Sequence, residues 1–342
     1  MAEPFAATGP TVWLGTPFFS GHLRGLGHDL RFKYIRPGDV FGWDDILALT
    51  GGATPGLVVY ADVSLSPPLV GVERYPCLTA FYAVDSHIHS WYPVYAQSFD
   101  LCLASIREHM PRFATGRLDA SRVWWTPPHA GDHERPPGNT PEKEWDLLFV
   151  GTMNPDLSPE RCAFLNAVRE RVPGFHAQSG KFAELFPRAR LVLNECRAGE
   201  LNFRIFEALG MGACLLTPDT GPPLTDLFTD GVELFLYPDR DANAVAALAR
   251  QLLADPARRE RAALAGLAEV DAKHRASVRA KEFAERIEAF AGQGRAERIV
   301  QERLAVAPVL HREVLRLFWL HHAETTLHDG CRAAYLKEGR FF

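Results

Sequence analysis

An arginine and a glutamate three positions apart are the first residues whose types and spacing could do chemistry. Arg204 and Glu207 lie in NFRIFEALG, and in a helix this spacing places both side chains on one face. A guanidinium group can donate forked hydrogen bonds to a diphosphate, and a carboxylate one turn deeper can accept both hydroxyls of a ribose. The pair could therefore hold a nucleoside diphosphate. It could equally be a surface ion pair, because the spacing fits both interpretations.

The residues just before this pair indicate a loop that could approach phosphate groups. A buried strand is expected to end near Glu195, and a helix is expected to start near Asn202. The loop between them contains Gly199, Glu200 and Leu201. Free backbone amides at the start of a helix, together with the helix dipole, favour phosphate oxygens. In an open α/β sheet, ligands bind beyond the carboxyl ends of the strands, which is where this loop would lie.

A second group of polar residues follows an apolar run in the first half of the chain. Asp85 ends the run CLTAFYAVD and His87 comes two positions later, where either could orient a hydroxyl group or take its proton. Either could instead belong to the cap of the next helix. With His89 they would also offer two imidazoles and a carboxylate, a plausible set of zinc ligands. Further metal ligands would have to come from loop-like or linker segments, so we expect no bound metal.

The loop from Gly15 to His22, GTPFFSGH, is a third candidate. It follows the first apolar run and contains Gly15 and Gly21, which let the backbone approach a ligand closely. We expect this loop to contribute to a binding site in the first half of the chain, with His22 as a further polar group.

Short apolar runs are the elements that would position all of these residues. They are TVWLGT, GLVVYAD, CLTAFYAVD, FDLCLAS and RVWWT in the first half, and WDLLFVG, ARLVLNE, ACLLTPD and VELFLYP in the second. Continuous rather than alternating hydrophobicity is typical of strands covered on both faces, and hence of a parallel sheet with crossover helices. Two such sets predict two α/β domains.

The segment 127–144 is rich in proline, glycine and charge, which predicts a linker between a first domain, 1–126, and a second, 145–291. The tail, 292–342, contains the amphipathic stretch LHREVLRLFWLHHAETTLH. This stretch is too apolar to stay in water. We therefore expect a helical extension that packs on the body of the protein or on a second copy of the chain, as a homodimer.

Composition excludes several classes of protein. The chain has 342 residues, of which 47% are hydrophobic and 23% charged, as in an ordinary globular protein. Its net charge of −5 gives no basic field to hold nucleic acid. No basic leader and no run of 18 apolar residues occurs, so we expect neither a signal peptide nor a membrane span. The six cysteines contain no CxxC pair and several lie in apolar runs, which favours reduced thiols and a cytoplasmic protein.

Several motifs together resemble those of GT-B glycosyltransferases of group 1, and most closely the branch of CgeB-like spore-maturation proteins. The stretch NFRIFEALGMG, the turn Asp230-Gly231-Val232 and the strand and loop WDLLFVGTMNPDLSPER are similar to the nucleotide-binding half of that family. The segment FYAVDSHIHSWYPVYAQSFDLCLAS is similar to its other half, and His274 stands where the family often has a histidine. The resemblance covers most of residues 11–290 and leaves the tail uncovered.

The resemblance implies two Rossmann-like domains that face each other across a cleft, with the sugar-nucleotide donor on the second domain and the acceptor on the first. It implies that Glu207 holds the donor ribose and that Arg204 cradles the diphosphate with the loop residues Gly199, Glu200, Leu201 and Asn202. Asp85 and His87 would form the acceptor-side catalytic pair, beside the loop with Gly15, Gly21 and His22.

The chain departs from the family at two places. Gly199 stands where many relatives have a second glutamate, with Glu200 one residue displaced. The loop after Gly151 has no Arg/Lys pair for the diphosphate, and Lys181 and Arg161 are the candidate substitutes.

The expected reaction is metal-independent transfer of a sugar from a nucleoside-diphosphate sugar to an acceptor hydroxyl. UDP is the expected nucleotide of the donor, which is a substrate, and we expect no separate cofactor. The acceptor is open: a protein, a glycan, a lipid or a small molecule. Two alternatives share the scaffold, namely a sugar-nucleotide epimerase and a non-catalytic protein that binds a nucleotide sugar.

Overall fold

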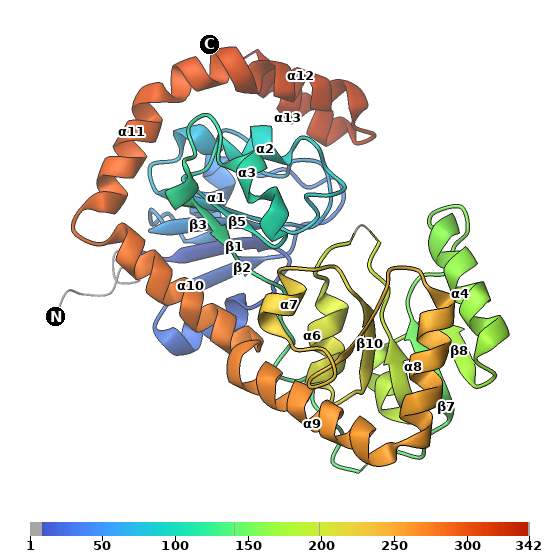
Figure 1. The fold of residues 1–342 in the computed structure, drawn as a ribbon. Helices are drawn as coiled ribbons and strands as arrows, with labels where there is room; N and C mark the ends of the chain where they lie inside the picture. Colours follow the sequence, from blue (N-terminus) through green and yellow to red (C-terminus); the bar gives the residue numbers. More distant parts are fainter. Residues whose placement is uncertain (1–8, 140, 198, 341–342) are drawn as a thin grey trace. The chain divides into compact units, whose positions relative to one another are not determined.

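The protein divides into two compact units in the computed structural model, which describes residues 9–139, 141–197 and 199–340 (Figure 1). The first unit comprises Met1–Pro127 together with Ala280–Phe342, and the second comprises Pro128–Arg279. Each unit contains one parallel sheet with helices. The predicted α/β class with two Rossmann-like sheets and a helical C-terminal extension is confirmed.

The sheet of the first unit has six parallel strands in the order β2-β1-β3-β4-β5-β6. In chain order the strands are β1 Thr11–Gly15, β2 Leu30–Lys33, β3 Leu57–Ala61, β4 Leu78–Ala83, β5 Leu101–Ala104 and β6 Val123–Trp125. Five of them are the predicted apolar runs. The edge strand β2, LRFK, was missed because Arg31 and Lys33 are exposed and interrupt its hydrophobicity.

Short helices connect these strands, and a longer helical extension returns to the same unit. The connecting helices are η2 Ser20–Leu26, α1 Trp43–Leu49, η3 Val72–Arg74, α2 Tyr92–Ala96, η4 Arg107–His109, α3 Met110–Phe113 and η5 Ala120–Arg122. The extension consists of α10 Ala276–Ala291, α11 Arg295–Leu310, the π-helical segment η7 His311–Leu315, α12 Arg316–Thr325 and α13 Asp329–Gly339.

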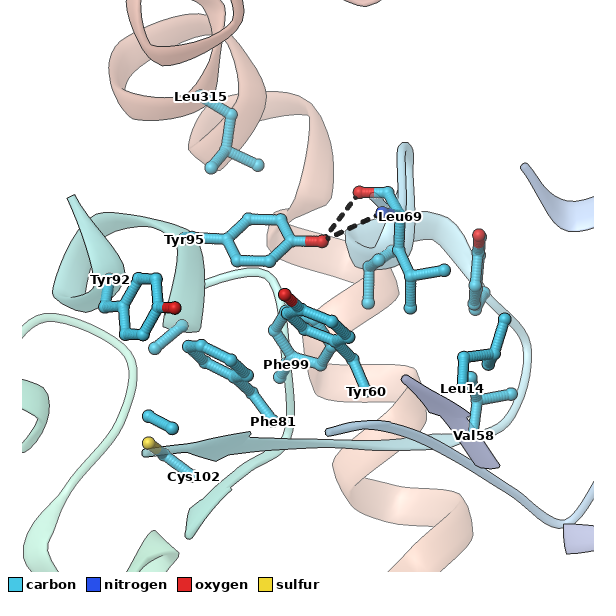
Figure 2. Close-up of a cluster of buried hydrophobic side chains, with 14 of the residues drawn as sticks. Leu14, Val58, Tyr60, Leu69, Phe81, Tyr92, Tyr95, Phe99, Cys102 and Leu315 are labelled. Atoms are coloured by element: carbon cyan, nitrogen blue, oxygen red, sulfur yellow. Dashed lines mark hydrogen bonds between the residues drawn. The ribbon is translucent and has the colours of Figure 1, made fainter. Parts of the chain in front are cut away.

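The core of the first unit is built from aromatic side chains of the strands and of the extension. Tyr60 and Phe81 stack with ring centroids 5.1 Å apart, and Tyr95 packs edge-on against both. The hydroxyl of Tyr95 donates to the carbonyl of Leu69 (2.8 Å) and accepts from its amide (3.2 Å), as Figure 2 shows. Leu315 of η7 reaches the same cluster from the extension. The tail therefore completes this core.

A buried arginine also fastens the extension to the first unit. Arg303 of α11 is fully buried and donates to the carbonyls of Tyr75 (2.6 Å), Cys77 (2.7 Å) and Val72. Its Nε lies 3.1 Å from a carboxylate oxygen of Asp100, which is also fully buried. Buried charges are stable only when they are paired and hydrogen-bonded, and this arrangement provides both.

The sheet of the second unit has five parallel strands in the order β11-β10-β9-β7-β8. The strands are β7 Trp145–Val150, β8 Phe175–Gln178, β9 Ala189–Leu193, β10 Leu215–Pro218 and β11 Phe235–Tyr237. The helices are α4 Pro159–Arg171, α5 Phe182–Leu185, η6 Phe186–Arg188, α6 Phe203–Gly210, α7 Leu224–Leu227, α8 Ala242–Ala254 and α9 Pro256–Lys273. Strand β8, FHAQ, is only partly buried and was not predicted.

The division into units differs from the predicted boundaries at two places. Residues 128–139 and 141–144, which were expected in a linker, belong to the second unit. Arg275 holds this segment, since its guanidinium donates to the carbonyls of Gly131 (2.9 Å) and Glu134 (2.7 Å). The second crossing falls inside α10, between Arg279 and Ala280. The boundaries of independently folding domains stay a prediction.

None of the helices in the described part of the chain is long and apolar enough to cross a membrane.

Candidate functional site

Arg204 and Glu207 lie on one face of α6, as the spacing predicts. Arg204 Nε donates to Glu207 Oε2 at 3.0 Å. The same guanidinium donates to the carbonyl of Val150, the last residue of β7, and lies over the rings of Phe182 (5.2 Å) and Phe186 (5.5 Å). The ion pair of the alternative interpretation is thus present, and it stands at the carboxyl end of the sheet, where ligands bind in this class of fold.

The carboxyl group of Glu207 is held in an unusual electrostatic state. Its side chain is only 17% exposed. Burial raises the pKa of Glu207 from 4.5 to about 7, and the nearby carboxylate of Glu134 adds to the rise. Arg204 opposes this rise and keeps it from going further. Glu207 therefore changes its charge near neutral pH. The charged carboxylate is the better acceptor of hydrogen bonds from a ligand.

Asn202, directly before α6, ties the loop to the strand that precedes it. Its Nδ2 donates to Asn194 Oδ1 and to the carbonyl of Glu195, both at 3.3 Å. Its Oδ1 is buried and has no hydrogen-bond partner, and its side chain does not cap the helix. Because the helix start has no side-chain cap, its first backbone N–H groups can donate to phosphate at this position, whereas the Asn202 oxygen, an acceptor, cannot.

The other loop residues take varied positions. Gly199 has a φ of +71°, which favours glycine, although a Cβ there would meet no atom within 4 Å. Leu201 is buried, and Glu200 accepts a hydrogen bond from the amide of Arg197 at 3.3 Å. The glycine is therefore needed for the conformation of the loop rather than for space.

The two candidate substitutes for a phosphate-binding basic pair are both engaged elsewhere. Arg161 Nε donates to Glu195 Oε2 at 2.6 Å, and the Glu195 carboxylate is almost fully buried. Lys181 is 82% exposed and pairs with Glu184 at 3.1 Å. Neither contacts the Arg204–Glu207 pair, although Phe182, next to Lys181, lies under Arg204.

In the first unit, a buried carboxylate that sequence reasoning missed organises the candidate acceptor site. Asp62, directly after β3, accepts from the amides of Ser64 (2.7 Å), Val84 (2.9 Å) and Asp85 (2.7 Å) and from the hydroxyl of Tyr92. Burial raises the pKa of Asp62, and these hydrogen bonds oppose the rise. Asp62 ends the apolar run GLVVYAD as Asp85 ends CLTAFYAVD, and that shared pattern was the signal that could have identified it.

The predicted pair Asp85 and His87 lies in the loop that Asp62 holds. Both side chains are partly exposed, and His87 Nδ1 is buried without a hydrogen-bond partner. His89 in the same loop makes a 2.8 Å hydrogen bond through Nε2 with Ser64 Oγ. Ser64 has a φ of +55°, a conformation that residues other than glycine rarely adopt. Strained backbone of this kind is frequent at ligand-binding sites.

The loop after β1 contacts Asp62 at its first residues. Thr16 Oγ1 donates to the carbonyl of Asp62 at 2.6 Å. Gly15 is required there, because a Cβ would lie 1.9 Å from the carbonyl oxygen of Ala61. Gly21 and His22 are exposed further along the chain, within η2. The structure thus brings the start of this loop into contact with Asp62.

The predicted zinc alternative at Asp85, His87 and His89 has no support from geometry. Within the described ranges, the group of potential ligands whose atoms lie within 4.8 Å of one another is Glu73, His311 and Glu338. Arg74 already bridges the two carboxylates of that group. We interpret it as an ion-pair network that fastens the extension to η3.

His274 is part of the core of the second unit. It is buried against Phe206 and Phe228, and its Nδ1 accepts from Arg279 Nη2 at 2.7 Å. Burial and the neighbouring cations Arg279 and Lys273 lower the pKa of His274 to about 3, so the imidazole is neutral. His274 therefore has a structural role in packing against α6.

A family model matches part of the chain. Residues 148–285, nearly the whole second unit with both Arg204 and Glu207, match the family model described as glycosyl transferase-like. The match indicates a glycosyltransferase. The CgeB-like branch is not confirmed by this match, and no curated protein matches the chain.

Solved structures of glycosyltransferases share the fold. A glycosyltransferase from Rickettsia africae ESF-5 matches with a TM-score of 0.59 and 10% identity, over 83% of this chain and 100% of that one. Anabaena HepE in complex with UDP and glucose matches with a TM-score of 0.57 and 12% identity, over 81% and 98%. Sucrose-phosphate synthase from Thermosynechococcus elongatus matches with a TM-score of 0.54 and 11% identity, over 81% of this chain and 98% of that one. These likenesses establish the GT-B fold.

Proposed function

We propose that this glycosyltransferase transfers a sugar from a UDP-sugar to an acceptor hydroxyl without a bound metal. The observation that carries the proposal is the Arg204–Glu207 pair at the start of α6, inside the region that matches the family model. Support for UDP comes from a structure of the same fold described as a complex with UDP and glucose.

On the donor side, Glu207 accepts hydrogen bonds from the ribose hydroxyls in this proposal. Arg204 and the backbone of residues 199–202 neutralise the diphosphate as it leaves, which is the task of a cation in metal-dependent transferases. Lys181, whose side chain is 82% exposed, adds a further positive charge in this proposal when donor is bound. Arg204 is well placed for its role because the Val150 carbonyl and two aromatic rings already fix its guanidinium.

On the acceptor side, Asp85 and His87 orient the acceptor hydroxyl and take its proton. Asp62 serves as a positioning residue, since its carboxylate holds the amide of Asp85. The structure describes six free cysteines, five of them buried, which agrees with a reducing compartment. We therefore place the reaction in the cytoplasm.

The test of the donor site is a nucleotide-binding measurement. Thermal shift with UDP, GDP, ADP and TDP identifies the base, because a specific ligand raises the melting temperature by mass action. Glu207→Ala is expected to weaken binding of the preferred nucleotide by roughly 1–3 kcal/mol, the scale of hydrogen bonds to a charged group.

The matched control is Glu170→Ala, at a carboxylate on α4 that is 76% exposed. It should bind nucleotide like the parent protein. Unshifted melting with every nucleotide, or parent-like binding by Glu207→Ala, would contradict the proposed donor site. A protein that binds a UDP-sugar but neither transfers nor isomerises the sugar would be the non-catalytic alternative.

A further inference from the structure

A cavity in the second unit lies beside the start of β9. It has a volume of about 390 Å³ and is lined by Ala189 and Arg190, where β9 begins. Arg204 contacts Val150, where the parallel strand β7 ends. Neither Arg204 nor Glu207 lines the cavity, although Phe186, whose ring lies 5.5 Å from the Arg204 guanidinium, does.

The lining of this cavity carries an excess of positive charge. Lys143, Arg190 and Arg259 line it, and Glu260 is its one acidic residue. The Lys143 ammonium donates to the carbonyl of Pro187 at 2.8 Å. Arg259 donates to the carbonyl of Leu253 at 2.9 Å. These two cations are thus bonded to backbone carbonyls, which carry no full negative charge.

Only Arg190 has a carboxylate partner among the three cations. Its Nη1 lies 3.1 Å from Asp146 Oδ1. In the described part of the chain, no carboxylate stands within ion-pair distance of Lys143 or Arg259. Two positive charges in the wall are therefore uncompensated by acidic partners.

The three cations lie close enough to repel one another. The pKa of Lys143 is lowered by burial and by the charges of Arg190 and Arg259. An anion placed between these groups would relieve that repulsion and gain charge-assisted hydrogen bonds. Three cations in one wall thus favour a ligand that carries more than one negative charge.

Apart from the three cations and Glu260, the lining residues are apolar or small, which adds a carbon part to the expected ligand. Phe186, Met211 and Ala263 contribute to the lining. A volume near 390 Å³ lies at the lower end of the range for small-molecule pockets. We propose that this cavity binds a small phosphate monoester, such as a sugar phosphate, with the phosphate on Lys143, Arg190 and Arg259. Such a molecule would be an effector rather than the donor.

The proposal is tested by calorimetry on the full chain with glucose 6-phosphate, inorganic phosphate and glucose. Saturable binding of glucose 6-phosphate is expected, with weaker binding of inorganic phosphate and none of glucose. Equal binding of inorganic phosphate would overturn the organic part of the proposal. Absence of saturable binding of both anions would overturn it altogether.

Variants locate the site. Lys143→Gln and Arg190→Gln should each weaken binding of glucose 6-phosphate by about tenfold or more, on the scale of a lost hydrogen bond between charged groups. Lys281→Gln is the matched control, because Lys281 is 68% exposed in the first unit. It should leave binding unchanged. Circular dichroism and melting temperature confirm that each variant is folded.

Glu207→Gln separates this cavity from the proposed donor site, because Glu207 does not line the cavity. It should retain binding of glucose 6-phosphate if the anion occupies the cavity. Loss of binding in Glu207→Gln, or parent-like binding in both Lys143→Gln and Arg190→Gln, would overturn the proposal. None of these outcomes depends on the transfer reaction.

Discussion

The carboxyl group of Glu207 experiences two opposing influences. Burial and the neighbouring Glu134 favour its neutral form, while the guanidinium of Arg204, 3.0 Å away, favours its charged form. The pKa of about 7 is the balance of the two. Spacing on the helix predicted the pair itself. The charge state depends on Glu134, which lies far away in the sequence in a segment that was expected to be a linker, so the sequence pattern could not predict it.

This balance predicts that donor affinity depends on pH. A charged Glu207 can accept from both ribose hydroxyls, whereas the neutral acid has lost acceptor capacity. Affinity for a UDP-sugar, whose diphosphate does not titrate near neutrality, should therefore rise as the pH increases through about 7 and then level off. Calorimetric titrations between pH 6 and pH 8 would measure it.

The control for this prediction is Glu207→Gln, which should bind more weakly and lose the dependence. A pH profile that persists in Glu207→Gln would assign the titration to another group. The same raised pKa has a consequence for folding. Its contribution to stability is full below the unfolded pKa of about 4.5 and is lost as the pH rises through about 7.

A second prediction at this scale concerns Asp85 and His87. If one takes the acceptor proton, Asp85→Asn or His87→Ala should lower kcat by about 10²–10⁴. Nucleotide affinity should stay at the parent value, because the proposed donor residues are in the other unit. Donor binding and turnover are measured on the same preparations. Parent-like turnover in both variants would move the acceptor site, with His89 or His22 as the next candidates.

At the scale of elements, Asp62 connects the loops that follow three strands, β1, β3 and β4. Its carboxylate accepts hydrogen bonds from backbone amides in the loops after β3 and β4. Its backbone carbonyl accepts a hydrogen bond from the hydroxyl of Thr16, after β1. Parallel strands explain this convergence, because their carboxyl ends lie at one edge of the sheet. The apolar runs predicted those strands well. The partner of each loop could not be predicted, since strand order depends on contacts between distant segments.

Replacing Asp62 with asparagine should therefore disturb several loops at once. The amide NH2 group would face backbone donors that now bond to a carboxylate oxygen, at a cost of about 1–3 kcal/mol of stability. Turnover should fall further than the loss of folded protein accounts for, with nucleotide affinity unchanged. Chemical unfolding and kinetics measure the two effects.

The matched control is Asp44→Asn, at an exposed carboxylate in the first turn of α1. It should change neither stability nor turnover appreciably. Turnover by Asp62→Asn that matches its folded fraction would show that Asp62 supports only the fold.

The two strands that were not predicted, and the position of the segment expected to be a linker, have physical explanations. Strands β2 and β8 are partly exposed, so they lack the continuous hydrophobicity by which the other strands were predicted. The segment around Gly131 and Glu134 has the composition of a linker, yet Arg275, distant in the sequence, bonds to its carbonyls. Composition reports local preferences. It does not report which distant side chain satisfies a backbone group.

On the scale of the whole molecule, the C-terminal extension is part of the first unit. Leu315, Phe318, Trp319 and Tyr335 of the extension belong to its hydrophobic core. The sequence predicted that a stretch as apolar as LRLFWL must be covered. It left open whether the body or a second chain covers it, and the described helices pack on the body.

Arg303→Met is expected to destabilise the first unit by about 3–5 kcal/mol, as when one partner of a buried ion pair is removed. Among the described residues, Arg117, at 3.6 Å, would be the remaining cationic partner of Asp100. Arg312→Met, at a side chain that is 59% exposed, is the control and should be within about 0.5 kcal/mol of the parent. Equilibrium unfolding in urea measures both.

Truncation after Gly292 tests the extension as a whole. The shortened protein should aggregate, because it exposes the core that Trp319 and Tyr335 cover. Light scattering measures this aggregation. A truncated protein that stays soluble and equally stable would contradict this role of the extension.

The interrupted first unit has a consequence for how the protein is made. Its opening segment, Met1–Pro127, leaves the ribosome long before Ala280–Phe342 exists, whereas Pro128–Arg279 is continuous. At about 5–20 residues per second, the opening segment waits on the order of 10–40 s for the helices that close its core. The second unit thus has all its residues before the first unit does. During that interval the nascent chain presents the aromatic surface around Tyr95, and this surface is where we expect chaperones to bind.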